Sequence, residues 1–266
     1  MILFCTSFNR ELYIASGKSL IKTFNLHQKE GKLFLGWEEI RPNNSKFITH
    51  NLSKDSFLQC WLKANEDIIP KYLGGKAKPC KCTVNPFKRK PETHENMCHF
   101  KWFNRNCSRW FRKVATIHAA LDYCKKNNIQ YLIWIDVDCY FRKSITEHKL
   151  RKIFRKDFSL FYMRGSRSIP ECGVFGFDLN KKGAYNFLKQ YFLYYQTKRY
   201  KKYNRWDDSF VFYRVLKERA AEFCSGRDIA SKTERGPHAE VLEYSMLKDF
   251  LGHNKGRHGR ILGIMK

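Results

Sequence analysis

Short apolar runs alternate along the chain with segments in which apolar residues recur every three or four positions. The runs ILFCTSFN (2–9), KLFLGWEE (32–39) and QYLIWIDVDCYF (130–141) predict strands. A helical period follows the first run over IASGKSLIKTF (14–24), and another begins at Ser108, a candidate helix cap. Helices that alternate with strands predict an α/β domain with a mostly parallel central sheet.

The second half of the chain continues this alternation. Two further strands are predicted, FSLFYMRG (158–165) and ECGVFGFDLN (171–180), and two helices, AYNFLKQYFLYYQ (184–196) and DDSFVFYRVLKE (207–218). The chain has 266 residues, enough to bury one sizeable core. We therefore expect a single domain over residues 1–266, with helices flanking its sheet.

Turn signals gather in residues 66–107, which predicts a loop-rich insertion in this domain. The same segment contains a Cys/His cluster: Cys80, Cys82, His94, Cys98, His99 and Cys107. One interpretation of the cluster is a zinc site, and the other is free thiols in a surface insertion. The spacing of Cys80 and Cys82 differs from the usual C-x2-C pair and favours free thiols.

The charge of the chain is strongly positive. Its 51 Lys and Arg against 25 Asp and Glu give a formal net charge of +26, with basic residues gathered in 76–90 and 197–205. Such a charge is typical of proteins that bind polyanions, but a lysine-rich surface composition explains it equally well. The N-terminus has no signal pattern, and no apolar run approaches the roughly 20 residues of a membrane helix. We expect a cytoplasmic protein with no membrane span.

Two carboxylates, Asp136 and Asp138, end the apolar run 131–135. Burying an unpaired carboxylate costs on the order of several kcal/mol, so a cation is expected to meet them. Residues two apart on a strand share a face, and the carboxyl ends of parallel strands are where ligands bind. Carboxylate oxygens suit Mg²⁺ or Mn²⁺. This indicates a metal site, although an arginine pair for one acid and solvent for the other is an alternative.

The C-terminal segment 250–266 has no regular period but carries groups that suit a metal–diphosphate site. His253 lies in LGHNKGRHG and offers an imidazole ligand for a divalent metal. Lys255 and Arg257 follow it and could hold phosphate oxygens. The competing interpretation is a flexible basic tail.

A strand that ends in WIDVD, with H-x-K-G downstream, resembles the nucleotide-sugar glycosyltransferases of the GT-A fold. The order of further motifs extends the resemblance over most of the chain. FCTSFN (4–9) is similar to the strand and loop that receive the nucleotide base, and SRWFRKV (108–114) to the helix whose basic residues reach the sugar nucleotide. ECGVFGFDLN (171–180) is similar to the strand that lines the sugar and acceptor pocket, and WDDSFVF (206–212) to an acidic motif beside the reaction centre. The resemblance implies one GT-A-like, Rossmann-like domain.

The resemblance also implies roles for individual residues. Mn²⁺ or Mg²⁺ would bridge the phosphates of a nucleoside-diphosphate sugar, and its protein ligands would be Asp138 and His253, with Asp136 on the metal through water or on the ribose. Residues that would contact the donor are Thr6, Ser7, Asn9, Arg109, Lys113, Asp136 and Lys255. The carboxylate beside the oxocarbenium-like centre would be Asp207, Asp208 or Glu171. Helix capping competes with this role for Asp207 or Asp208, and a strand-edge position on the surface competes with it for Glu171.

Together these inferences predict a metal-dependent glycosyltransferase that moves a sugar to a hydroxyl of a glycan or, alternatively, of a modified base in DNA. A non-catalytic nucleic-acid-binding protein would explain the charge of +26 but not acids at the end of an apolar strand. A metal-dependent nuclease or nucleotidyltransferase would use the same two aspartates, together with a third acid and a second metal. The donor sugar, and the choice between retention and inversion at the sugar carbon, stay open.

Overall fold

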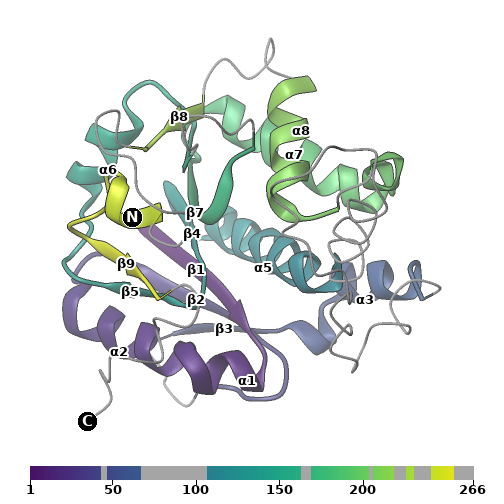
Figure 1. The fold of residues 1–266 in the computed structure, drawn as a ribbon, viewed down its shortest axis with the longest axis horizontal. Helices are drawn as coiled ribbons and strands as arrows, with labels where there is room; N and C mark the ends of the chain where they lie inside the picture. The colour runs from purple at the N-terminus through teal and green to yellow at the C-terminus, as the bar shows by residue number, and fades with distance from the viewer. Residues whose placement is uncertain are drawn as a thin grey trace, which may run out of the picture.

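A computed structural model describes most of the chain and shows the alternation of helices and strands that the sequence predicts (Figure 1). The described residues are 1–42, 47–66, 107–162, 169–203, 206–218, 226–230 and 241–254. Most of the predicted insertion, with every member of the Cys/His cluster except Cys107, lies outside these ranges, as does the tail from residue 255.

A seven-stranded sheet forms the centre of the described chain, with its strands in the order β3-β2-β1-β4-β7-β6-β8. The strands are β1 (Ile2–Phe8), β2 (Lys32–Trp37), β3 (Ile48–Asn51), β4 (Tyr131–Ile135), β6 (Ser159–Tyr162), β7 (Glu171–Asp178) and β8 (Gly226–Asp228). Neighbouring strands are parallel, except that β7 runs antiparallel to both β4 and β6. The predicted α/β class with a mostly parallel sheet is therefore confirmed.

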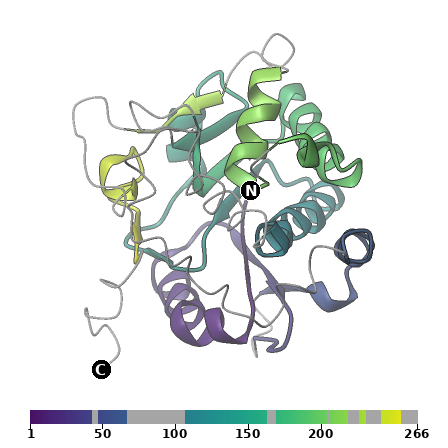
Figure 2. The ribbon, with the colours of Figure 1, turned by 45° about the vertical axis from the view of Figure 1, so that its right-hand side comes forward.

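Helices cover both faces of this sheet (Figure 2). They are α1 (Arg10–Leu12), α2 (Lys18–His27), α3 (Ser56–Lys63), α5 (Cys107–Lys126), α6 (Glu147–Phe154), α7 (Lys182–Gln196) and α8 (Asp208–Glu218), with a π-helical turn at Tyr13–Gly17 and 3-10 turns at Leu52–Lys54, Arg199–Lys202 and Val241–Tyr244. Alternation along β1 sends Leu3 and Cys5 into the apolar cluster under α3, α5, α7 and α8. Ile2 and Phe4 enter the opposite cluster, which holds α2 and α6.

Several local predictions need correction. The run 130–141 is two strands rather than one, because the chain turns after Ile135 and resumes as β5 (Cys139–Phe141). The C-terminal segment, in which we predicted no regular structure, contains β9 (Leu251–His253), which pairs antiparallel with β5. Ser108 lies inside the first turn of α5 and not before it, so it is not the cap.

β3 and α3 were not predicted at all. β3 has the sequence ITHN, in which only Ile48 is apolar, so it lacks the alternation of apolar and polar residues by which a strand is recognised. In the described part of the chain, no helix combines the length and the apolar composition that a membrane crossing requires.

Candidate functional site

A tight turn at the carboxyl end of β4 carries the two predicted metal-binding aspartates. The turn closes where the N–H of Cys139 donates to the carbonyl oxygen of Asp136 at 3.0 Å. The N–H of Asp136 donates to the carbonyl oxygen of Gly173 on β7 at 2.7 Å, which fixes the turn to the sheet. The side chains of Asp136 and Asp138 are 33% and 32% exposed. Backbone turning, and not strand alternation, therefore places these carboxylates.

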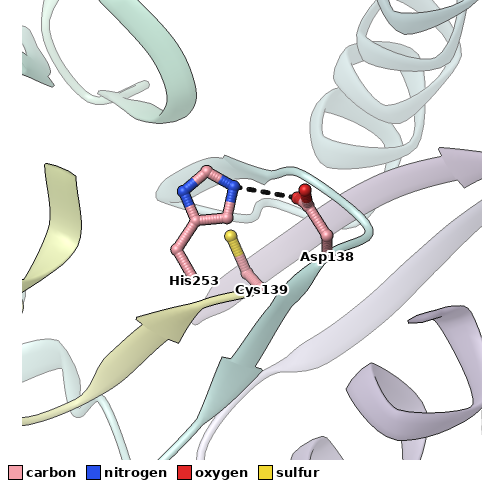
Figure 3. Close-up of side chains that lie close together, drawn as sticks. All are labelled: Asp138, Cys139 and His253. Atoms are coloured by element: carbon pink, nitrogen blue, oxygen red, sulfur yellow. Dashed lines mark hydrogen bonds and ion pairs between the residues drawn. The ribbon is translucent and has the colours of Figure 1, made fainter. Parts of the chain in front are cut away.

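The pairing of β5 with β9 brings the predicted histidine to the second aspartate (Figure 3). His253 Nε2 lies 2.9 Å from Asp138 Oδ1, although the two residues are 115 positions apart. Cys139 is directly opposite His253 in the ladder. Within the described ranges, these three residues form the one group whose potential metal-ligand atoms all lie within 4.8 Å of one another. Cys139 was not among the site residues that we predicted from the sequence. Its position directly after Asp138 was the signal that could have indicated it.

The cation that meets the first aspartate is Lys113, on α5. Its Nζ lies 3.0 Å from Asp136 Oδ1, and it donates to Asp208 Oδ2 at 2.6 Å and to the carbonyl oxygen of Cys172 at 2.7 Å. Trp134 Nε1 also donates to Asp136 Oδ1, at 2.7 Å. Burial by itself would lower the pKa of Lys113, but the carboxylates of Asp136 and Asp208 raise it well above its ordinary value. The lysine therefore stays charged inside the protein.

The two neighbouring acids at the start of α8 have different roles. Asp207 Oδ1 accepts a hydrogen bond from the N–H of Phe210 at 3.1 Å, so Asp207 caps the helix, as one of the two acids was expected to do. Asp208 is buried against Lys113. Burial raises the pKa of Asp208 to about 6, although Lys113 acts in the opposite direction.

Gly173, on β7, lies where three of the predicted site residues converge. A Cβ atom added to Gly173 would lie 3.4 Å from His253 Cε1, 3.6 Å from Asp136 Oδ2 and 3.7 Å from Glu171 Oε1. β7 runs antiparallel to β4, so its first residues lie beside the last residues of β4. The side chain of Glu171 therefore borders the same glycine as those of Asp136 and His253.

The predicted nucleotide-binding residues leave the sheet at the same edge, because β1 and β4 are parallel neighbours. Thr6 is fully buried, and its Oγ1 has no hydrogen-bond partner among the described residues. Ser7 is half-buried. The Asn9 side chain accepts from the N–H of Leu12 at 2.9 Å, which caps α1. Asn9 thus has a structural role whatever it binds.

The remaining predicted donor contacts lie apart from this group or outside the described chain. Arg109 is exposed on the first turn of α5, whereas Lys113, one turn later, is buried. Lys255 falls beyond the last described residue, Asn254. The structure thus brings together Asp136, Asp138, Glu171, His253, Lys113 and Asp208.

Comparison with known proteins adds a resemblance in structure but none in sequence. No protein-family model and no curated protein matches the chain. The apo form of mouse xyloside xylosyltransferase 1 is similar with a TM-score of 0.45 at 11% identity, over 86% of this chain and 85% of that one. The glycosyltransferase GlyE of Streptococcus pneumoniae TIGR4 is similar with a TM-score of 0.42 at 13% identity, over 82% of this chain and 43% of that one. Likenesses this distant assign no activity, which has to be inferred from the site.

Proposed function

We propose that the chain is a metal-dependent glycosyltransferase that moves a sugar from a nucleoside-diphosphate sugar to a hydroxyl acceptor. The observation that carries the proposal is the 2.9 Å contact between Asp138 and His253. The WIDVD and H-x-K-G motifs carried the resemblance as separate stretches of sequence, and this contact joins Asp138 of the first to His253 of the second.

The donor atoms of this pair suit the proposed cation. Carboxylate oxygen and imidazole nitrogen both bind Mn²⁺, and a carboxylate is the usual protein ligand of Mg²⁺. Two ligands at right angles around an octahedral ion, each about 2.1 Å from it, are about 3 Å apart. The observed separation of 2.9 Å meets this requirement without movement of the backbone. When bound, such a cation would neutralise charge on the leaving diphosphate.

Lys113 and Trp134 would act on the donor indirectly, through Asp136. An ammonium group has three hydrogens, and those of Lys113 are matched by Asp136, Asp208 and the carbonyl oxygen of Cys172. This favours a role in holding carboxylates over direct contact with the donor. Asp136 Oδ2 faces Gly173 and is the oxygen we assign to a ribose hydroxyl or to a water on the cation.

Glu171 is the carboxylate that we assign to the reaction centre. Glu171 lies near Gly173 together with His253, at the metal centre. There it would stabilise positive charge at the sugar carbon or accept the proton of the acceptor hydroxyl. The acceptor class that we propose is a glycan.

The test is a panel of nucleotide sugars incubated with the protein and Mn²⁺, read as release of nucleoside diphosphate. We expect release from at least one donor, its loss in EDTA, and a decrease of at least about 100-fold in Asp138→Asn. Asp122→Asn, an exposed change on α5, is the matched control and should keep full activity. Undiminished release in EDTA or in Asp138→Asn would contradict the metal-dependent mechanism.

A further inference from the structure

Cys139 and His253 form a cross-strand pair beside the metal centre. Residues directly opposite each other in an antiparallel ladder project from the same face, with Cβ atoms about 4.5–5.5 Å apart. Figure 3 shows the thiol of Cys139 below the ring of His253, beside the contact between that ring and the carboxylate of Asp138. Cys139 is 2% exposed and belongs to one of the two apolar clusters. Backbone pairing therefore presents a sulfur atom to the site.

We propose that Cys139 is a third protein ligand for thiophilic cations, so that Asp138, Cys139 and His253 together bind Zn²⁺ or Cd²⁺. This inference rests on the metal centre of the proposed function and deepens it, because it determines which ions that centre accepts. Mn²⁺ and Mg²⁺ prefer oxygen and nitrogen ligands and would use Asp138 and His253 without the sulfur.

The geometry needs only a small adjustment for this coordination. In a tetrahedral zinc site with bonds of about 2.0–2.3 Å, the ligand atoms are about 3.3–3.7 Å apart. The carboxylate oxygen, the imidazole nitrogen and Sγ already lie within 4.8 Å of one another. Side-chain rotations that move the ligand atoms by about 1 Å would bring them to tetrahedral spacing. The register of the β5–β9 ladder would not have to change.

Coordination through sulfur has a chemical consequence for the centre. The S–H bond breaks, sulfur becomes bonded to the cation, and the proton passes to solvent. A tetrahedral ion with three protein ligands has one open position, whereas a cation bridging two phosphates needs two. An ion held by Cys139 would therefore exclude Mn²⁺ and leave the centre unable to hold a diphosphate in the bridging mode.

The experiment follows the sulfur-to-cadmium charge-transfer absorption as Cd²⁺ is added to the full chain without donor. The readout is the difference between the wild type and Cys139→Val, because other cysteines of the chain would contribute equally to both. We expect a band that is lost in the variant, a Cd²⁺ and Zn²⁺ affinity at least tenfold lower, and an Mn²⁺ affinity within about threefold by electron paramagnetic resonance. Zn²⁺ should release bound Mn²⁺ from the wild type.

Two further variants make the result decisive. Cys139→Ala repeats the loss of sulfur in a second packing context, in case one of the two variants is unfolded. Cys124→Ser removes another buried thiol, on α5, and should leave the band intact. An unchanged band or unchanged Cd²⁺ affinity in the Cys139 variants would show that Cys139 is a core residue only, and would leave Mn²⁺-dependent diphosphate release untouched. A band without any Mn²⁺-dependent release would contradict the proposed function alone.

Discussion

Lys113 reaches three acceptors from inside the core, on Asp136, Asp208 and Cys172. Each of these acceptors replaces a water molecule that would bind the ammonium group in the unfolded chain. The buried lysine therefore keeps an acceptor for each of its three hydrogens. Two carboxylates share this one cation, which leaves a net negative group next to the proposed metal centre. A buried lysine of this kind holds the turn after β4 against the start of α8.

Replacing Lys113 by methionine, which has a similar length and no charge, should lower the free energy of unfolding by about 3 kcal/mol or more. The reason is that Asp136 and Asp208 would be left without their shared counter-ion. Lys125→Met is the matched control on the same helix, because Lys125 is 53% exposed and lies 3.9 Å from Asp122. The control should stay within about 0.5 kcal/mol of the wild type. Urea unfolding measures both, and equal stability of the two variants would contradict the role given to Lys113.

The two-stranded sheet of β5 and β9 depends on a glycine at its middle position. Gly252 is opposite Tyr140, and a Cβ atom on Gly252 would lie 2.2 Å from Tyr140 Cζ. The ring has little room to move, because Arg142 donates to its hydroxyl at 2.9 Å. The glycine therefore allows a tyrosine to pack across the ladder that brings His253 to Asp138.

Gly252→Ala should accordingly weaken this ladder. We expect a loss of about 1–3 kcal/mol of stability from overpacking, together with a clear loss of Mn²⁺ affinity. Adding Tyr140→Ala to Gly252→Ala removes the ring and should recover much of the Mn²⁺ affinity, whereas Tyr140→Ala alone should not change it greatly. Thermal melting and Mn²⁺ titration of the three variants test this, and wild-type behaviour of Gly252→Ala would exclude the clash.

The main strands could be predicted from the sequence, and the second sheet could not. β1, β2, β4 and β7 are runs in which nearly every residue is apolar, so burial is evident locally. β9 has three residues, and its partner lies more than a hundred positions earlier. Cys139 and His253 lie next to each other only because β9 pairs with β5. The burial of Lys113 could not be predicted either. Its spacing of four residues from Arg109 places both on one side of the helix, but does not say whether that side faces solvent or the core.

At the scale of the whole molecule, the charge of +26 is not concentrated in the described part of the site. Acids predominate there: Asp136 and Asp208 pair with Lys113, Asp138 lies beside His253, and Glu171 lies near Gly173. The basic residues of 198–202 lie at the end of α7, in and beside a 3-10 turn. Acids at the site are not typical of a groove that binds a polyanion.

We expect duplex DNA to bind weakly for this reason. Charge reversal at Lys198, Lys201 and Lys202 should leave the salt dependence of any binding almost unchanged, because few phosphates are neutralised there. Arg199 is kept, since it lies over the Tyr194 ring at 4.6 Å. Filter binding over a range of salt concentrations measures the slope for both proteins. A steep wild-type slope that flattens in the variant would make nucleic acid the leading acceptor.

Two truncations should separate the ladder from the basic tail. A chain ending at Asn254 keeps β9 and should melt like the wild type, but it should bind nucleoside diphosphate at least tenfold more weakly because Lys255 and Arg257 are gone. A chain ending at Phe250 also loses Leu251, which is fully buried, and should be less stable by about 2 kcal/mol or more. Calorimetry measures the affinity of each truncated chain for nucleoside diphosphate, and thermal melting measures its stability. Unchanged diphosphate affinity in the longer truncation would remove the tail from the site.

The pairing of β5 with β9 also bears on when a newly made chain would acquire the metal centre that we propose. Synthesis proceeds from the N-terminus, and the large sheet as far as β8 can assemble while the last segment is still being translated. His253 becomes available only afterwards, when β9 can add to β5. An incompletely translated chain, or one clipped before β9, would therefore have a nearly finished fold with one half of its cation site. Cation binding would then distinguish finished molecules from interrupted ones.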